Sequence, residues 1–321
     1  MVPGASLAVG VAFLLDATVG EPPESIHPVA RLGAAIGVLD RSSAAPRLYG
    51  ALIALLVPLL AAGLAAFPVW VLFARSPLLA GVVAGGILFT TVSLDMLVGL
   101  TRDVIESSET DLERAKGEVI GLVGRDTADL SAGEVRSAAV ESLAENLADG
   151  LVGPLLAFAL GSFLSLPFAV GAAAWVKAVN TLDSMLGYRD RPHGTASARL
   201  DDAVAWVPAR LSAVLLAVAA LAPGAIGTAN ACAREPTSPN SGWPMATMAA
   251  AIGVRLHKPG QYELNPTATL PSIADARRAV TVGQRAGLLA FVVAAGIAWV
   301  GGSVGWPGDA LALHGGVIGW F

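Results

Sequence analysis

Residues 141–183 read ESLAENLADGLVGPLLAFALGSFLSLPFAVGAAAWVKAVNTLD, and they decide the fold of this chain. Between Asp149 and Lys177 no residue is charged, and roughly 20 apolar residues are enough to cross the hydrocarbon core of a bilayer. Carboxylates and amides flank this run on both sides. Polar groups beside lipid are costly, so such a cluster indicates a functional site. The stretch therefore predicts a membrane protein with polar chemistry at its lipid–water boundary.

The composition extends this prediction to the whole chain. Of its 321 residues, 55% are hydrophobic and only 14% are charged, and the mean hydropathy is +0.66. Soluble domains carry about 25% charged residues, so we expect a single all-α domain, 1–321, that forms a polytopic membrane helical bundle. No basic patch with interleaved aromatic residues occurs, which argues against a nucleic-acid partner. The lone cysteine, Cys232, excludes an internal disulfide.

Uncharged apolar runs mark the expected membrane helices. The clear runs are 50–74, 77–94, 150–176, 211–233 and 286–308, and two runs too short to span alone are 4–15 and 310–321. The polar loops between them are 21–49, 101–148, 177–209 and 234–284. The first two clear runs nearly touch, so they predict a tight helical hairpin that leaves the first two loops on the same side. The arginines of loop 21–49 make that side cytoplasmic by the positive-inside rule.

Two topologies are open for the run 150–176. A single crossing would put loop 177–209 on the opposite side from Glu141 and Glu145. Alternatively, Gly161-Ser162 and Pro167 break the run into two half-helices that dip in and return, which is tolerated where backbone is buried in protein. Chemistry shared between the loops favours the re-entrant arrangement, or else deep burial from both ends.

A stripe of carboxylates leads into this run. Glu141, Glu145 and Asp149 are spaced i, i+4 and i+8, so they share one helix face. Three like charges on one face repel and need a cation, a proton or an arginine partner. Mg²⁺ held by one or two carboxylates and by substrate phosphates would meet that need. A solvated helix face is the simpler alternative, but this helix runs directly into the apolar segment.

More polar candidates follow the apolar run. Asn180 and Asp183 are three residues apart and share a helix face, and Asp201-Asp202 opens a further helix, where it could simply complement the helix dipole. Arginines and other polar side chains near these positions complete the candidate set. They are His27, Arg125, Asp126, Asn146, Arg199, Arg210, Asn240 and Trp243. Turn chemistry alone explains the segment around Asn240 and Trp243, although an indole beside an amide also suits ring stacking.

Several motifs, in order along nearly the whole chain, resemble the adenosylcobinamide-phosphate synthases, the CobD/CbiB family of integral membrane proteins. They are Leu15-Asp16, Gly20-Glu21-Pro22, His27-Pro28-Val29, Gly124-Arg125-Asp126-Thr127, Glu141-Ser142-Leu143-Ala144-Glu145-Asn146, Asp149-Gly150, Asn180-Thr181-Leu182-Asp183-Ser184-Met185, Gly187-Tyr188-Arg189, Ser197-Ala198-Arg199-Leu200-Asp201-Asp202, Trp206-Val207-Pro208-Ala209-Arg210, Ser238-Pro239-Asn240 and Gly242-Trp243-Pro244. The chain departs from the family pattern at Glu21, where an Asp is usual. The loop between Gly187 and Ala196 is also shorter, so no role is carried over to His193.

The resemblance implies an ATP-dependent, Mg²⁺-requiring ligase of the cell membrane in cobalamin biosynthesis. It would join adenosylcobyric acid to (R)-1-amino-2-propanol or its phosphate, giving adenosylcobinamide or its phosphate. Membrane lipid and other membrane enzymes of the corrinoid pathway are expected partners. The hypothesis places Mg²⁺ on Glu141, Glu145, Asp149 and Asp183 with help from Asn146, phosphates on Arg125, Arg199 and Arg210, and the general base at Asp201 or Asp202.

Two other function classes compete with this one. An intramembrane Mg²⁺-dependent prenyl- or phospho-alcohol transferase also places Asn/Asp pairs at helical spacing. A catalytically silent membrane sensor of the AmpE type would not need the whole set of acids, amides and arginines. The presence of the full set favours the ligase.

Overall fold

The computed structural model describes residues 4–41, 43–122, 127–188 and 191–303, and most of them are helical. The helices are α1 (Gly4–Val19), α2 (Pro28–Leu39), α3 (Pro46–Phe73), α4 (Pro77–Phe89), α5 (Leu94–Thr110), α6 (Leu112–Val119), α7 (Ala132–Leu147), the π-helical η1 (Ala148–Val152), α8 (Gly153–Gly161), α9 (Leu166–Leu186), the 3₁₀ turn η2 (Pro192–Gly194), α10 (Thr195–Val204), α11 (Trp206–Ala219), α12 (Ala225–Ala229), α13 (Gly242–Ile252) and α14 (Ile273–Ser303). Two short strands, β1 (Leu256–Lys258) and β2 (Tyr262–Leu264), pair antiparallel with Leu256 opposite Leu264.

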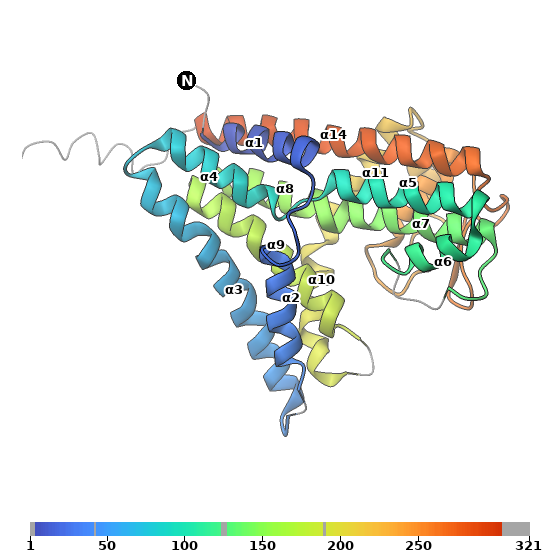
Figure 1. Ribbon diagram of the computed structural model, residues 1–321, viewed down its shortest axis with the longest axis horizontal. Helices are drawn as coiled ribbons and strands as arrows, with labels where there is room; N and C mark the ends of the chain where they lie inside the picture. Colours follow the sequence, from blue (N-terminus) through green and yellow to red (C-terminus); the bar gives the residue numbers. More distant parts are fainter. Residues whose placement is uncertain (1–3, 42, 123–126, 189–190, 304–321) are drawn as a thin grey trace, which may run out of the picture.

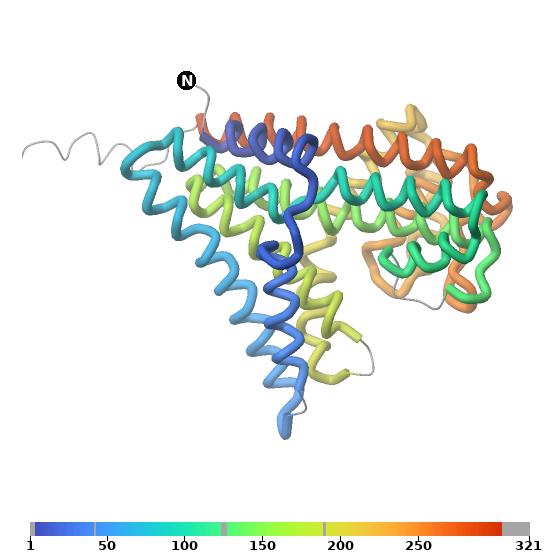
Figure 2. The backbone as a smooth tube through the Cα atoms, in the orientation of Figure 1, coloured from blue at the N-terminus to red at the C-terminus, as the bar shows by residue number. Residues whose placement is uncertain are grey.

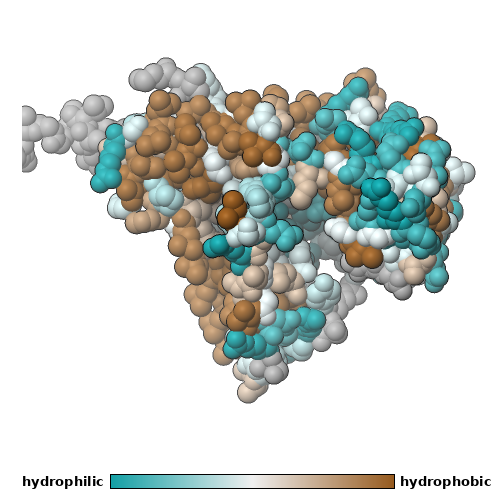
Figure 3. All heavy atoms as spheres, in the orientation of Figure 1, coloured by the Kyte–Doolittle hydropathy of each residue, from teal (hydrophilic) through white to brown (hydrophobic). Residues whose placement is uncertain are grey.

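The molecule consists of a long body and an arm that leaves it at an angle (Figures 1 and 2). In the body, α1 packs on α4 and α14, and α5 packs on α7 and α14. In the arm, α9 packs on α3 and α2, and α10 packs on α3 and α9. Hydrophobic residues cover the arm along α3 and one end of the body, whereas hydrophilic residues gather at the other end around α5 and α6 (Figure 3).

Membrane-length helices account for the hydrophobic surface. Four helical stretches of the described residues are long and apolar enough to cross a bilayer, namely Pro46–Phe73, Pro77–Thr110, Ala132–Gly161 and Ile273–Ser303. A fifth is added if Pro192–Val204 and Trp206–Ala219, which are bent by 46°, count as one span. The prediction of an all-α, polytopic membrane protein is therefore confirmed. Within the described residues, the short β1–β2 hairpin is the only β-structure, and it was not predicted from the sequence.

The apolar run 150–176 reverses direction in the middle. Helix α8 ends at Gly161 and α9 begins at Leu166, with the Ser165 side chain accepting a hydrogen bond from the Phe168 N–H. A Cβ atom at Gly161 would lie only 2.8 Å from the Cα of Ala169, so the two helices approach closely at a glycine. The run turns back on itself, with α8 packed on α9, and this brings loops 101–148 and 177–209 to the same end of the molecule. That the turn is re-entrant within the bilayer stays a prediction.

The turn between α8 and α9 lies beside the turn between α3 and α4, at the apolar end of the molecule. A Cβ atom on Gly4 would lie 3.6 Å from the Leu166 side chain and 3.8 Å from the Pro77 carbonyl oxygen. The turn between α3 and α4 and the turn between α8 and α9 are therefore neighbours. The tight hairpin expected from the first two apolar runs is confirmed, since only residues 74–76 separate α3 from α4.

Two of the predicted runs differ from the structure. Residues 211–233 do not form one helix, because α11 ends at Ala219 and the chain turns at Leu221, whose φ of 55° is left-handed, before α12. The last predicted run, 310–321, lies outside the described residues. Helix α14 begins directly after Ser272, and Ser272 and Asp275 exchange hydrogen bonds at its start.

Candidate active site at the base of the arm

Five carboxylates from the helical segments α7, η1, α9 and α10 gather where the arm leaves the body. We call them the acidic cluster; they are Glu145, Asp149, Asp183, Asp201 and Asp202. Their charges act on one another: Asp149 interacts electrostatically with Asp201, Glu145 and Asp183, and Asp183 interacts with Asp202. The side chain of Asn180 hydrogen-bonds with Asp201. The chain reversal thus brings together the two groups of acids that flank the apolar run.

The local helix geometry presents the first two acids. Glu145 lies near the end of α7, and Asp149 lies in the π-helical turn η1 that follows. Single π-turns within α-helices are frequent at functional sites. Asp149, Asn180 and Asp201 line one small cavity together with Gly153 and Pro208, so the three polar groups face a common space.

Two lysines accompany the acidic cluster, and sequence reasoning did not select them. Lys177 of α9 interacts electrostatically with Asp149 and Glu21. Lys258 of β1 interacts with Glu145. Lys177 is the first charge after a long uncharged run, so the rule that singled out the acids would also have selected it. The position of Lys258 depends on the β1–β2 hairpin, which was not predicted from the sequence.

Glu141 occupies a different setting from the rest of the carboxylate stripe. It is only 4% exposed, and its two oxygens accept hydrogen bonds from Ser137 Oγ (2.7 Å) and from Tyr262 Oη (2.9 Å). The Ser137 hydroxyl also accepts the His257 N–H, at 2.8 Å. Glu141 therefore ties the β1–β2 hairpin to α7, which places Lys258 beside Glu145.

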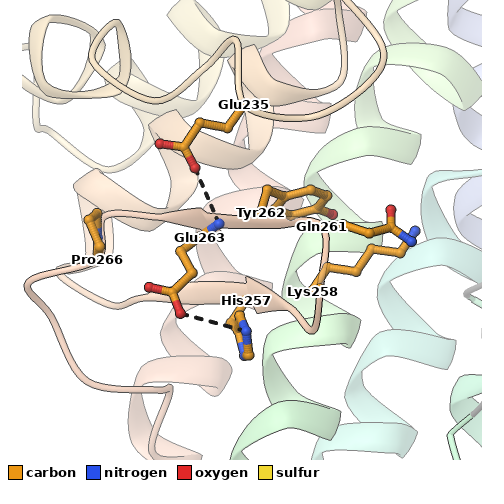
Figure 4. A pocket seen from close by; sticks show the side chains of 8 residues that line it. Glu235, His257, Lys258, Gln261, Tyr262, Glu263 and Pro266 are labelled. Carbon is orange, nitrogen blue, oxygen red and sulfur yellow. Dashed lines mark hydrogen bonds and ion pairs between the residues drawn. The ribbon is translucent and has the colours of Figure 1, made fainter.

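The hairpin borders a separate polar pocket of about 440 Å³ (Figure 4). His257 and Glu263 lie 3.6 Å apart on one side of it, and Glu235 accepts the Glu263 N–H. Lys258 and Gln261 extend away from these residues (Figure 4). Lys258 also interacts electrostatically with Glu145, so the hairpin connects this pocket with the acidic cluster.

The N-terminal motifs supply structural support for the site. Gly20 takes a left-handed φ of 68° directly after α1. His27 caps α2 by accepting the Val29 N–H, and its Nε2 atom lies 2.7 Å from Glu21. His27 is thereby placed as a positioning residue for Glu21, which in turn neighbours Lys177 electrostatically.

Asp16 caps the start of helix α5, although it lies far from that helix in the sequence. Its carboxyl accepts hydrogen bonds from the backbone N–H groups of Leu94 (3.0 Å) and Asp95 (3.2 Å), the first residues of α5. Burial raises the pKa of Asp16 to about 6, and these two hydrogen bonds act in the opposite direction. Helix α5 begins without a side-chain cap of its own from Ser93, so Asp16 satisfies donors that would otherwise lack partners.

Arg210 is the centre of a clamp, which we define as Arg210, Trp206, Trp243 and Asn240. The guanidinium lies 4.6 Å from the Trp206 ring and 5.2 Å from the Trp243 ring. It donates to Asn240 Oδ1 and to the Pro239 carbonyl, and Asn240 Nδ2 donates to the Asp202 carbonyl at 2.7 Å. The structure thus gives Arg210 a structural role in this clamp, and its expected role toward phosphate stays a prediction.

The remaining candidates lie around the cluster or outside the described part of the chain. Arg199 is exposed on α10, and Asn146 is exposed on α7 with its amide donating to Ser142. Arg125 and Asp126, which were predicted to bind substrate, lie outside the described residues. No structural role is assigned to either.

The acidic cluster does not form a closed metal site by itself. Among the described residues, no three His, Cys, Asp or Glu side chains converge closely enough to hold a metal ion. Mg²⁺, however, keeps several waters and is usually bound through one or two carboxylates together with substrate phosphates. An open group of carboxylates fits that mode of binding and does not fit a structural metal cage.

The fold and this cluster define a multi-pass membrane protein with a polar site at one end of its apolar helices. The chain belongs to the CobD/CbiB family, whose model, described as CobD/Cbib protein, matches residues 9–291. It is 36% identical over 301 residues to the probable cobalamin biosynthesis protein CobD of Methanothrix thermoacetophila, covering 89% of this chain and 94% of the relative. No solved structure shows significant similarity.

Bacterial relatives align equally well. The cobalamin biosynthesis protein CobD of Klebsiella pneumoniae is 34% identical over 330 residues, with 98% of each chain covered. That of Geobacter metallireducens is 38% identical over 288 residues, with 84% of this chain and 87% of the relative covered. The family match over residues 9–291 spans the positions of the acidic cluster and the clamp.

Proposed function

We propose that this protein is an ATP-dependent amide ligase of cobalamin biosynthesis in the cell membrane, with its site on the cytoplasmic side. It joins adenosylcobyric acid to (R)-1-amino-2-propanol or its phosphate. The observation that carries the proposal is the acidic cluster, assembled by the α8–α9 reversal and accompanied by Lys177 and Lys258. The names of the relatives support the pathway, and the cluster supports a reaction that handles phosphates.

The proposed reaction has two steps. An oxygen of the substrate carboxylate attacks the γ-phosphorus of ATP, the bond to the bridging oxygen breaks, and ADP leaves with that electron pair. The resulting acyl phosphate is a good acyl donor. The amine nitrogen then attacks the acyl carbon, the new C–N bond forms, and inorganic phosphate leaves.

Side chains of this chain supply charge and proton transfer. Phosphoryl transfer depends on positioning and charge neutralisation more than on covalent help from the protein. Lys177 and Lys258 are the cations placed to neutralise phosphate oxygens, while Arg199 lies exposed nearby on α10. A carboxylate of Asp201 or Asp202 takes the proton that the amine loses, as a general base.

Mg²⁺ fits this site as the partner of ATP. Glu145, Asp149 and Asp183 would hold it in an open arrangement, and it would neutralise charge on the phosphates when bound. Chelation with EDTA is therefore expected to abolish turnover of the purified enzyme, and added Mg²⁺ is expected to restore it.

The proposal is tested by substitutions that keep size and remove charge. Glu145→Gln and Asp183→Asn should abolish formation of adenosylcobinamide or its phosphate while the protein stays folded in detergent. Asp129→Asn, at an exposed acid outside the cluster, is the matched control and should keep wild-type turnover. Full turnover in both cluster variants would dismiss the site.

Complementation places the step in the pathway. A corrinoid auxotroph that lacks this activity should grow on cobyric acid only when it carries this gene, and it should grow on cobinamide without the gene. Growth on cobyric acid without the gene would remove the assignment.

A further inference from the structure

A deep apolar groove lies on the arm, apart from the acidic cluster. It has a volume of about 660 Å³, within the range of about 300–1,000 Å³ in which proteins hold small-molecule ligands. Helices α2 and α3 form its sides, α9 contributes Ala174, Lys177 and Ala178, and the last turn of α4 closes it. Figure 1 shows α2 beside α3 in this part of the arm.

The groove is open toward the region that lipid would occupy. On the α3 side its lining includes Leu60 and Leu64, which are 64% and 69% exposed. Both belong to a membrane-length helix, as does Gly86 of α4. An apolar surface of this kind inside a bilayer accepts a hydrocarbon chain.

The charged residues of the lining are both cations. They are Arg31 of α2 and Lys177 of α9, among otherwise apolar or hydroxyl side chains. A Cβ atom on Gly33 of α2 would lie 3.5 Å from the sulfur of Met185 in α9, and Ile36 and Leu182 belong to one buried hydrophobic cluster. Helices α2 and α9 therefore pack together, and each contributes one cation to the lining of the groove.

The Arg31 guanidinium has N–H donors left with which to bind an anion. Its guanidinium donates to the Ser25 carbonyl oxygen at 3.1 and 2.9 Å, and no carboxylate of the described residues forms an ion pair with it. A guanidinium has five N–H donors, and a phosphate group can accept two at once. The negative charges of Glu21 and Asp149 partly balance the positive charge of Lys177. The unbalanced positive charge of the groove therefore lies mostly on Arg31.

We propose that the groove binds one anionic phospholipid, with an acyl chain along α3 and α4 and its phosphate at Arg31 and Lys177. The proposal goes beyond the reaction proposed above and shares only Lys177 with it, whereas its test uses Gly86 and Arg31, which that reaction does not use. A lipid there would fill the space between α2 and α3 and hold the arm at its angle to the body.

The test is native mass spectrometry of the detergent-purified protein with added phosphatidylglycerol or phosphatidylcholine of the same acyl chains. The wild type should retain one phosphatidylglycerol in preference to phosphatidylcholine. Gly86→Phe should reduce that binding sharply, because a Cβ atom at Gly86 meets no atom within 4 Å and the ring would enter the groove. Gly10→Phe is the matched control, since Gly10 also has open space but lies outside the groove.

A second pair of variants separates charge from shape. Arg31→Gln should weaken phosphatidylglycerol binding by about tenfold, the effect of losing a charge-assisted hydrogen bond, and should weaken phosphatidylcholine binding less, because choline already balances the phosphate of that lipid. Arg41→Gln is the control, because Arg41 also flanks α2, is exposed and donates to a backbone carbonyl. Equal retention of the two lipids, unchanged binding in Gly86→Phe and Arg31→Gln, or displacement of lipid by a second copy of the chain or by corrinoid substrate, would overturn the proposal.

Discussion

At the scale of single residues, Gly187 sets the position of a proposed catalytic carboxylate. Its N–H donates to the Asp183 carbonyl at 2.7 Å, and a Cβ atom at this position would overlap the Asp183 carboxyl. Gly187→Ala should therefore displace that side chain and lower turnover by about 100-fold, as misplacements of about 1 Å do. Steady-state assays of product formation measure this effect.

Gly150→Ala is the control for Gly187→Ala. Gly150 lies in η1 next to Asp149, but a Cβ atom there meets nothing within 4 Å. Turnover should stay near the wild-type value. A Gly187→Ala enzyme as active as the Gly150→Ala enzyme would show that Asp183 does not need its observed position.

Asp16 gives a second prediction at this scale, for stability rather than catalysis. Asp16→Ala leaves the N–H groups of Leu94 and Asp95 without acceptors, at a cost of about 1–3 kcal/mol for a buried unsatisfied donor. Asp16→Asn keeps one acceptor oxygen, so it still serves one of these two N–H groups. The midpoint of thermal unfolding in detergent should fall more for Ala than for Asn, and equal midpoints would contradict the capping role.

The sequence selected candidate acids that the structure brings together, whereas their roles stay predictions. Spacing alone selected Glu145, Asp149 and Asp183, because acids beside an apolar run are costly unless they function. It did not separate Glu141 from them, since the Tyr262 hydroxyl that engages Glu141 comes from a hairpin 121 residues away. Contacts between such distant segments leave no periodic signal in the chain.

At the scale of helices and strands, the breaks were predictable where local chemistry caused them. Gly161-Ser162 and Pro167 marked the α8–α9 reversal, because glycine permits the close approach and proline starts a new helix. The end of α11 was missed because 211–233 contains no charge until Arg234. The β1–β2 hairpin was not predicted, because its two strands have only three residues each within the polar loop 234–284, although Pro259-Gly260 between them is a turn signal.

The clamp around Arg210 is the element-scale feature with the clearest consequence. It fastens the segment that begins α13 to the start of α11, beside Asp202. Arg210→Lys removes the planar fork and much of the stacking on two indoles, so it should reduce stability by about 1–3 kcal/mol. Thermal unfolding measures this loss, with Arg199→Lys at an exposed arginine as the control.

Kinetics then separate the two roles considered for Arg210. If it acts through the clamp, the Lys variant should lose kcat through displaced Asp202 with little change in KM for ATP. A large rise in KM for ATP with unchanged stability would instead support direct phosphate binding by Arg210.

At the scale of the whole molecule, the fold collects the turns of its apolar helices at one end and its polar chemistry at the other. Gly4, Pro77 and Leu166 meet at the apolar end, and Glu145, Asp183 and Asp201 meet at the base of the arm. Loops 101–148 and 177–209 must therefore face the same side of the membrane, whatever the number of complete crossings.

Cysteine accessibility tests this arrangement in intact cells and inverted vesicles. The native Cys232 is buried, so Cys232→Ala provides a background for single cysteines at the exposed positions Asn146, Ser184, Arg75 and Leu164. Asn146→Cys and Ser184→Cys should react with a membrane-impermeant maleimide in the same one of the two preparations. Arg75→Cys and Leu164→Cys, in the turns of the apolar end, should not react from that side. Reaction of Asn146→Cys and Ser184→Cys from opposite sides would require a full crossing between α7 and α9, and the acidic cluster could not then form one site.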